Sequence, residues 1–187
     1  PNGAGKFTVS RVLLGMLEAT SGSVILDGKD ISMLSTQERI TQGLAFVPQS
    51  KNVFPSMTVE ENLQMGGFIR KDDISNTINE VYELFPILYE KRKQLAEQLS
   101  GGQRQQVAFG RAMMTKPSIM LLDEPTAGVS PIVMDEIFSN ILDVKKAGMA
   151  VLMVEQNAQQ ALNIADKGFV LVSGRNEHTG TGKELIN

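Results

Sequence analysis

The stretch that decides the fold is IMLLDE, residues 119–124, where an unbroken apolar run leads directly into two carboxylates. A strand without alternation of apolar and polar residues is typical of a parallel sheet that helices cover on both faces. The stretches LAFV (44–47), AVLMV (150–154) and GFVLV (168–172) have the same apolar character. Residues with helical spacing lie between them, and strands that alternate with helices imply a parallel sheet. The sequence therefore predicts an α/β fold with a mostly parallel sheet.

One part of the chain interrupts this alternation. From about residue 54 to residue 109 the spacing is almost entirely helical. We therefore expect a single domain over residues 1–187, in which an α/β core (1–53 and 110–187) carries an inserted helical subdomain (54–109). The spacing predicts helices at 6–17 (apolar at Val9, Val12, Leu13, Met16 and Leu17), 36–42, 58–65, 73–85, 100–115, 131–146 and 158–165, and a further strand at 23–28.

Composition excludes several classes of protein. The formal net charge of −3 argues against nucleic acid as a main partner. The chain has no cysteine, so disulfides and thiolate metal sites are excluded. No apolar run approaches the length of a membrane span, and nothing resembles a signal peptide, so we expect a soluble, cytosolic chain. The first residues read as the middle of a motif and residues 182–187 as the opening of a helix, so we expect truncation at both ends.

The stretch NGAGKFT, residues 2–8, precedes a helix and has the form of a phosphate loop. Glycines let the backbone turn its amides toward phosphate oxygens, and a helix N-terminus attracts an anion. The candidate ATP-binding residues are Asn2, Gly3, Ala4, Gly5, Lys6 and Thr8. The full pattern requires Ser or Thr directly after the lysine as a magnesium ligand, and Phe7 stands there instead. The hydroxyl of Thr8 points about 100° away on a helix, and a plain glycine-rich helix cap is the alternative interpretation.

The two carboxylates of IMLLDE come at the end of a buried strand, where open α/β sheets bind their ligands. Asp123 would hold magnesium, and Glu124 would orient or deprotonate an attacking water. The alternative is a strand that ends in two acids before the turn at Pro125.

The stretch LSGGQ, residues 99–103, is the most specific feature of the chain. A serine and two glycines at a helix start form a second anion site. This pentapeptide is the signature of the ATP-binding cassette (ABC) ATPases, and the chain resembles that family over essentially its whole length. The resemblance implies a P-loop nucleotide-binding core with ATP and Mg²⁺ as cofactors. Gln49, which follows FVP (46–48), matches the glutamine loop of the family.

The resemblance also implies partners. In this family two ATPase subunits pack head to tail, so the signature residues Ser100, Gly101, Gly102 and Gln103 would contact the γ-phosphate bound by the other subunit. Gln49 would contact magnesium and water, and would link the site to the helical subdomain. That subdomain would dock on transmembrane permease subunits, which places the chain at the cytoplasmic face of the membrane as a peripheral protein.

A family histidine is replaced in this chain by Gln156, in the run VEQN (154–157). Glutamine can donate a hydrogen bond to the γ-phosphate but cannot titrate. Together with MTVEENL (57–63), MGGF (65–68) and VYELFP (81–86), this run resembles the second ATPase subunit of branched-chain amino acid importers, which work indirectly with a substrate-binding protein. Closely related subunits serve amide, urea and other amino acid systems. The only histidine, His178, is expected at a solvated surface in a polar, glycine-rich tail.

Two other functions are compatible with the motifs. Soluble cassette ATPases act on DNA or the translation machinery, but they usually carry coiled-coil insertions or two cassettes, which this chain lacks. A nucleotide-binding cassette with impaired hydrolysis is the other alternative, because Phe7 removes a magnesium ligand.

Overall fold

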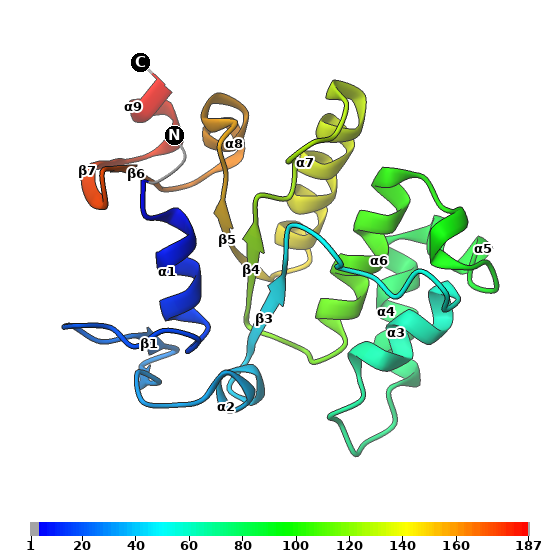
Figure 1. Cartoon of the computed structure of the whole chain (residues 1–187). Coiled ribbons are helices and arrows are strands. Elements are labelled where there is room, and N and C mark those ends of the chain that lie inside the picture. Colours follow the sequence, from blue (N-terminus) through cyan, green and yellow to red (C-terminus); the bar gives the residue numbers. More distant parts are fainter. Residues whose placement is uncertain (1–3, 187) are drawn as a thin grey trace.

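Three parallel strands form the centre of the fold, in the order β3 (Leu44–Val47), β4 (Ile119–Asp123) and β5 (Ala150–Val154). The structure is a computed structural model and describes residues 4–186. Val47 lies opposite Leu122 and Asp123 lies opposite Val154, so the carboxyl ends of the three strands meet at one edge. The predicted α/β fold with a parallel sheet is confirmed for these three strands (Figure 1).

Alternate residues of the central strand face two separate cores. Leu121 packs with Leu14 and Leu44 beneath α1 (Lys6–Leu13). Met120 and Leu122 belong to the larger core, which includes residues of α6 (Gly101–Met113) and α7 (Pro131–Lys146). Both faces of β4 are therefore covered, which is the physical reason that its sequence has no polar alternation.

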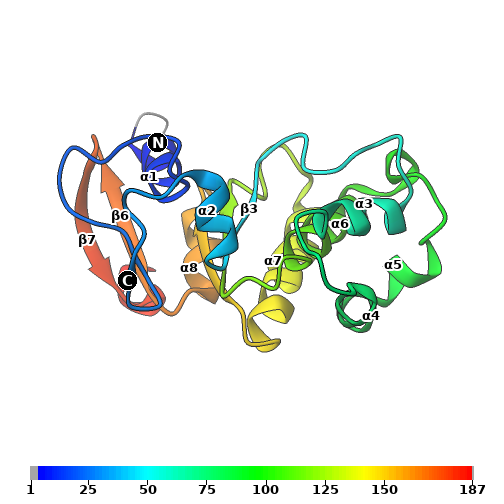
Figure 2. The same cartoon turned by 90° about the horizontal axis from the view of Figure 1, so that it is seen from below.

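Helices dominate the middle of the chain, at the end of the molecule away from α1 and β6 (Figure 2). The first, α3, begins at a capping box in which Thr58 and Glu61 satisfy each other's backbone N–H groups. Helices α3 and α6 pack so closely that a Cβ atom on Gly66 would lie 2.2 Å from the carbonyl oxygen of Arg111. Helix α6 continues to Met113 without a break at residue 109. The helices of this region are α3 (Val59–Gly66), α4 (Ser75–Leu84), α5 (Pro86–Glu90), the 3-10 turn Ala96–Gln98 and α6.

The prediction that residues 168–172 join the parallel sheet is wrong. Strand β6 (Gly168–Val172) pairs antiparallel with β7 (Arg175–Gly180) as a hairpin. The two residues of its turn, Ser173 and Gly174, both have positive φ angles, as a tight hairpin turn requires. His178 lies on β7 and is exposed, so its predicted place at a solvated surface is confirmed.

The first helix is shorter than predicted and presents a different face. It ends at Leu13, because the chain reverses at Gly15, whose φ is +73°. Ser10 and Leu14 are the buried positions, whereas the predicted apolar face is exposed at Val9, Met16 and Leu17. The buried hydroxyl of Ser10 donates to the carbonyl of Lys6 at 3.4 Å, so this polar side chain has a partner within its own helix.

The remaining elements are short. The strand predicted over residues 23–28 is shorter in the structure, where it is β1 (Ile25–Leu26). It pairs antiparallel with β2 (Lys29–Asp30) as a hairpin. The helices are α2 (Thr36–Thr41), α8 (Ala158–Ile164) and α9 (Gly182–Ile186). Within residues 4–186, no helix is both long and apolar enough to span a membrane.

Candidate functional site

Three predicted site residues converge where the parallel strands end. The ammonium Nζ of Lys6, at the start of α1, lies 3.7 Å from Oε1 of Glu124, directly after β4. Gln156, in the loop after β5, donates a hydrogen bond from Nε2 to the same carboxylate oxygen at 2.8 Å. Both Lys6 and Glu124 are largely shielded from solvent, with side chains 17% and 18% exposed. The fold thus unites residues from three separate segments of the chain.

The loop before α1 depends on glycine. Gly5 caps the helix with a φ of +93°, in the left-handed region that favours glycine. A Cβ atom on Gly5 would lie 3.2 Å from the Cα of Gly174, and the N–H of Gly174 donates to the carbonyl of Ala4 at 3.1 Å. The β6–β7 turn therefore supports this loop. Asn2 and Gly3 lie outside the described residues.

The N-terminus of α1 is favourable for an anion. Its first turn contains no acidic residue, so the partial positive charge of the free amides is not offset there. The side chain of Phe7 is 56% exposed, and the guanidinium carbon of Arg11 lies 4.3 Å from the centre of its ring. Thr8 is also exposed. The position that should supply a hydroxyl thus presents an aromatic ring stacked against an arginine.

Asp123 is the buried acid of the pair, with 8% of its surface exposed. Burial raises the pKa of this carboxyl, the charge of Glu124 raises it further, and Lys6 lowers it. Two carboxylates against one ammonium leave excess negative charge, which a divalent cation would relieve.

The described residues contain no group of three or more His, Cys, Asp or Glu side chains able to hold a metal by themselves. Magnesium usually binds through one or two carboxylates together with substrate phosphates and water. Asp123 and its surroundings fit that mode, whereas Phe7 contributes no ligand atom.

Glu124 has an unusual backbone conformation, with a φ of +44°. Its N–H donates to the carbonyl of Val154 at 2.8 Å, which ties the end of β4 to the end of β5. A non-glycine residue with positive φ costs of order 1–3 kcal/mol and is frequently found at functional sites.

Gln49 is exposed in the loop that follows β3, and this loop leaves the sheet at the same edge as Glu124. Three residues later, Nδ2 of Asn52 donates to Oε1 of Gln105 in α6 at 2.9 Å. The glutamine loop is therefore hydrogen-bonded to the helix that begins with the signature.

The signature residues form the start of α6. Ser100 is its N-cap, and Ser100 and Gln103 form a capping box with hydrogen bonds of 3.2 and 3.1 Å. Gly102 is buried against α7, where a Cβ atom would lie 2.1 Å from a carboxylate oxygen of Glu136. Among residues 4–186, no hydrogen bond or ion pair joins residues 100–103 to Lys6 or Glu124, and α1 and α6 lie on opposite sides of the strands (Figure 1).

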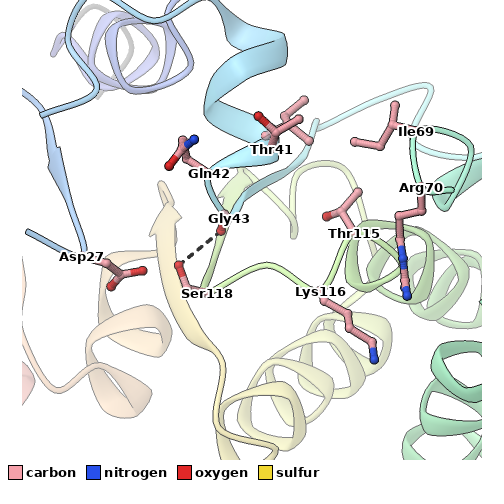
Figure 3. Close-up of a pocket in the computed structure, with 10 residues that line it drawn as sticks. Asp27, Thr41, Gln42, Gly43, Ile69, Arg70, Thr115, Lys116 and Ser118 are labelled. Atoms are coloured by element: carbon pink, nitrogen blue, oxygen red, sulfur yellow. Dashed lines mark hydrogen bonds between the residues drawn. The ribbon is translucent and has the colours of Figure 1, made fainter. Parts of the chain in front are cut away.

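A pocket of about 410 Å³ lies at the other end of the strands. Gly43 and Ser118, which precede β3 and β4, form its floor and are joined by a hydrogen bond of 3.4 Å (Figure 3). Ile69 and Arg70 of the helical region line one wall, and Thr41 of α2 lines another. The pocket thus lies between the core and the helical region, away from Glu124.

Sequence reasoning missed three residues beside Gln156: Thr126, Glu155 and Asn157. They are linked to one another by hydrogen bonds. Glu155 and Asn157 lie within the VEQN run, but that run does not show that their side chains bond to Thr126, which is distant in sequence.

The sequence of this chain is similar to those of known proteins. A family model described as ABC transporter matches residues 1–127. The chain is 44% identical over 186 residues to the high-affinity branched-chain amino acid transport ATP-binding protein BraG of Pseudomonas aeruginosa, covering 99% of this chain and 80% of that protein. It is 35% identical over 191 residues to the lipopolysaccharide export system ATP-binding protein LptB of Haemophilus influenzae, covering 100% of this chain and 79% of LptB.

Solved structures agree. The crystal structure of the ADP conformation of MJ1267, an ATP-binding cassette of an ABC transporter, matches with a TM-score of 0.90 and 32% identity. The match covers 100% of this chain and 79% of that one.

Proposed function

Because this chain belongs to the ABC transporter family, as one of its ATP-binding and ATP-hydrolysing subunits, we propose that it powers the import of branched-chain amino acids. The reaction site that we propose is the edge where Lys6, Glu124 and Gln156 meet. Their convergence is the observation that carries the proposal.

Each residue has a distinct chemical task in this proposal. The ammonium of Lys6 and the free amides of α1 neutralise phosphate charge. Glu124 orients the attacking water and accepts its proton. Gln156 holds the carboxylate of Glu124 in place through the bond at 2.8 Å.

Magnesium would be held by Asp123, with Gln49 at the same edge of the sheet. When bound, magnesium offsets the negative charge that develops on the phosphate oxygens. Ser100, Gly101, Gly102 and Gln103 belong to a second anion site, and we propose that they act on ATP held by a partner cassette.

We propose that residues 54–109 form the subdomain that docks on permease subunits at the cytoplasmic face of the membrane. Support comes from Phe54, Met65, Phe68 and Ile69, whose apolar side chains are 40%, 40%, 78% and 44% exposed. Such exposed apolar groups are common where partners bind. The pocket beside Ile69 adds a concave surface to this region.

The transported substrate rests on similarity. Identity with BraG is higher than with LptB, at 44% against 35%. The VEQN run around Gln156 also resembles the branched-chain importers. Loss of the subunit should therefore abolish uptake of radiolabelled leucine in cells. Normal uptake, together with a weakened outer-membrane barrier, would favour lipopolysaccharide export instead.

The reaction site is tested by Glu124→Gln in the assembled transporter. We expect ATP hydrolysis to fall roughly 10²- to 10⁴-fold, because the general base is lost, while ATP still binds. Glu177→Gln, an identical change at an exposed position on β7, serves as the matched control. Hydrolysis at the wild-type rate in Glu124→Gln would reject this site.

A further inference from the structure

Glu155 directly precedes Gln156, and its carboxylate accepts four hydrogen bonds. Oε1 accepts hydrogen bonds from the backbone N–H of Thr126 at 3.0 Å and from the Thr126 hydroxyl. Oε2 accepts from the backbone N–H groups of Gln156 at 2.7 Å and Asn157 at 3.1 Å. Hydrogen bonds to an ionised acceptor are about twice as strong as those between neutral groups.

Thr126 completes a closed network. Its side chain is buried, and its hydroxyl oxygen also accepts a hydrogen bond from Nδ2 of Asn157 at 2.8 Å. Thr126 lies in the loop after β4, whereas Glu155 and Asn157 lie in the loop after β5. The network therefore clamps together the two loops that carry Glu124 and Gln156.

Gln156 needs such a support. It is exposed, and an exposed glutamine has many accessible rotamers, so holding its side chain in one of them costs entropy. Two of the bonds to Glu155 fix the backbone at Gln156 and at the residue after it. A fixed backbone limits where Nε2 can lie, and Nε2 donates to the reacting carboxylate of Glu124.

We propose that Glu155 is a positioning residue for ATP hydrolysis: it holds Gln156, and through Gln156 the carboxylate of Glu124, in the arrangement needed for attack by water. The inference rests on the proposed roles of Glu124 and Gln156. In this role Glu155 itself touches neither substrate nor the attacking water. It acts by clamping the two loops.

The test uses Glu155→Gln in the assembled transporter. Glutamine keeps the shape but offers one acceptor oxygen instead of two, so bonds to one of the loops are lost. We expect kcat to fall roughly 10- to 100-fold, as for a misplaced reacting group. The KM for ATP should stay within about threefold, because Lys6 and α1 are unaffected. Glu155→Asp, which retains the charge and both oxygens, should recover most of the lost rate.

Thr126→Val is the second variant, since it removes the shared hydroxyl at nearly constant volume and leaves Glu155 in place. It should also lower kcat with little change in KM. Glu177→Gln is the control for removal of an exposed acid, and the melting temperature of each variant reports on folding. Wild-type kcat in folded Glu155→Gln and Thr126→Val would overturn the inference.

A double-mutant cycle separates positioning from general loop stability. If Glu155 acts through Gln156, Glu155→Gln should lower kcat little further in a Gln156→Ala background. A full additional loss in that background would overturn the positioning role. Glu124→Gln in the same assay keeps the two proposals apart: activity there would reject the proposed site, whereas loss there with unchanged Glu155→Gln would reject only this inference.

Discussion

The most informative perturbation is Phe7→Ser, because it restores the hydroxyl that a phosphate loop normally places after its lysine. In the structure the ring at this position is 56% exposed and stacks against Arg11 at 4.3 Å. The ring is not part of either core, so the change removes little packing.

The cost to folding can be estimated from these contacts. Full burial of a phenylalanine side chain is worth about 1.5–3 kcal/mol, and somewhat less than half of this residue is buried, so about 1 kcal/mol is lost. An exposed cation–π contact contributes about 0.5–1 kcal/mol more. Phe7→Ala suffers the same two losses without gaining a hydroxyl. It is therefore the matched control.

The gain can be estimated in the same way. A polar contact to a charged group is worth about 1.5–3 kcal/mol. If that energy is realised in the transition state, Phe7→Ser should hydrolyse ATP roughly 10- to 100-fold faster than Phe7→Ala. The assay is steady-state ATP hydrolysis by the assembled transporter over a range of Mg²⁺ concentrations. The serine variant should also reach half-maximal rate at lower Mg²⁺.

Equal rates for the two variants at every Mg²⁺ concentration would refute the reasoning. Such a result would mean that Asp123, phosphate oxygens and water suffice to hold the metal. The interpretation of Phe7 as the cause of impaired hydrolysis would then have to be abandoned.

Three further predictions concern single contacts. Gln156→Ala removes the 2.8 Å bond to Glu124 and should lower kcat roughly 10- to 100-fold in the ATPase assay, so an unchanged kcat would argue against its role. Arg39 is 3% exposed and donates to four backbone carbonyls, so Arg39→Met should reduce the free energy of unfolding by about 3 kcal/mol in denaturant titrations. The hydrogen-bonded Arg70 lowers the pKa of Asp72 to about 2, so its stabilising effect is complete above about pH 4 and disappears as the pH falls through 2. Asp72→Asn should therefore lower the melting temperature at pH 7, and the difference from the wild type should shrink as the pH falls from about 4 toward 2. A difference that does not change with pH would contradict this account of the pair.

Local patterns predicted much of the fold. The capping box of Thr58 and Glu61 predicted the start of α3, and Pro131 at the first turn predicted the start of α7. These signals are local, because each acts on backbone groups within one turn of helix. The unbroken apolar run of β4 was equally informative, since its burial on both faces is a direct consequence of its place in the sheet.

Two of the failures concern which neighbour an element pairs with or packs against. The apolar run of β6 has the composition of a buried strand, yet a two-residue turn at Ser173 and Gly174 allows it to pair with its own continuation. In α1, Ser10 is buried although it is polar, and its hydroxyl finds a partner within the helix at the carbonyl of Lys6. The spacing of apolar residues predicts neither the pairing of β6 nor the burial of Ser10.

The site shows the same division. Lys6 and Glu124 were predicted from a motif at a helix start and from the end of an apolar strand, whereas Gln156 was predicted from the family resemblance alone. The structure brings the three side chains together. Thr126 and Glu155 were missed because their importance lies in hydrogen bonds between two loops that are distant in sequence.

The capping box at the signature gives a chemical reason to expect a second cassette. The hydroxyl oxygen of Ser100 accepts a bond from the N–H of Gln103, and the amide oxygen of Gln103 accepts one from the N–H of Ser100. These bonds use acceptors, so a hydroxyl hydrogen and an NH₂ group remain to donate beside the amides of α6. The start of α6 is therefore an assembly of donors suited to an anion, on the opposite side of the strands from Lys6 (Figure 1). A head-to-tail pair would bring each set of donors to the phosphate bound at the other chain's Lys6, so in a mixed dimer Ser100→Arg on one chain should impair the site whose Glu124 belongs to its partner.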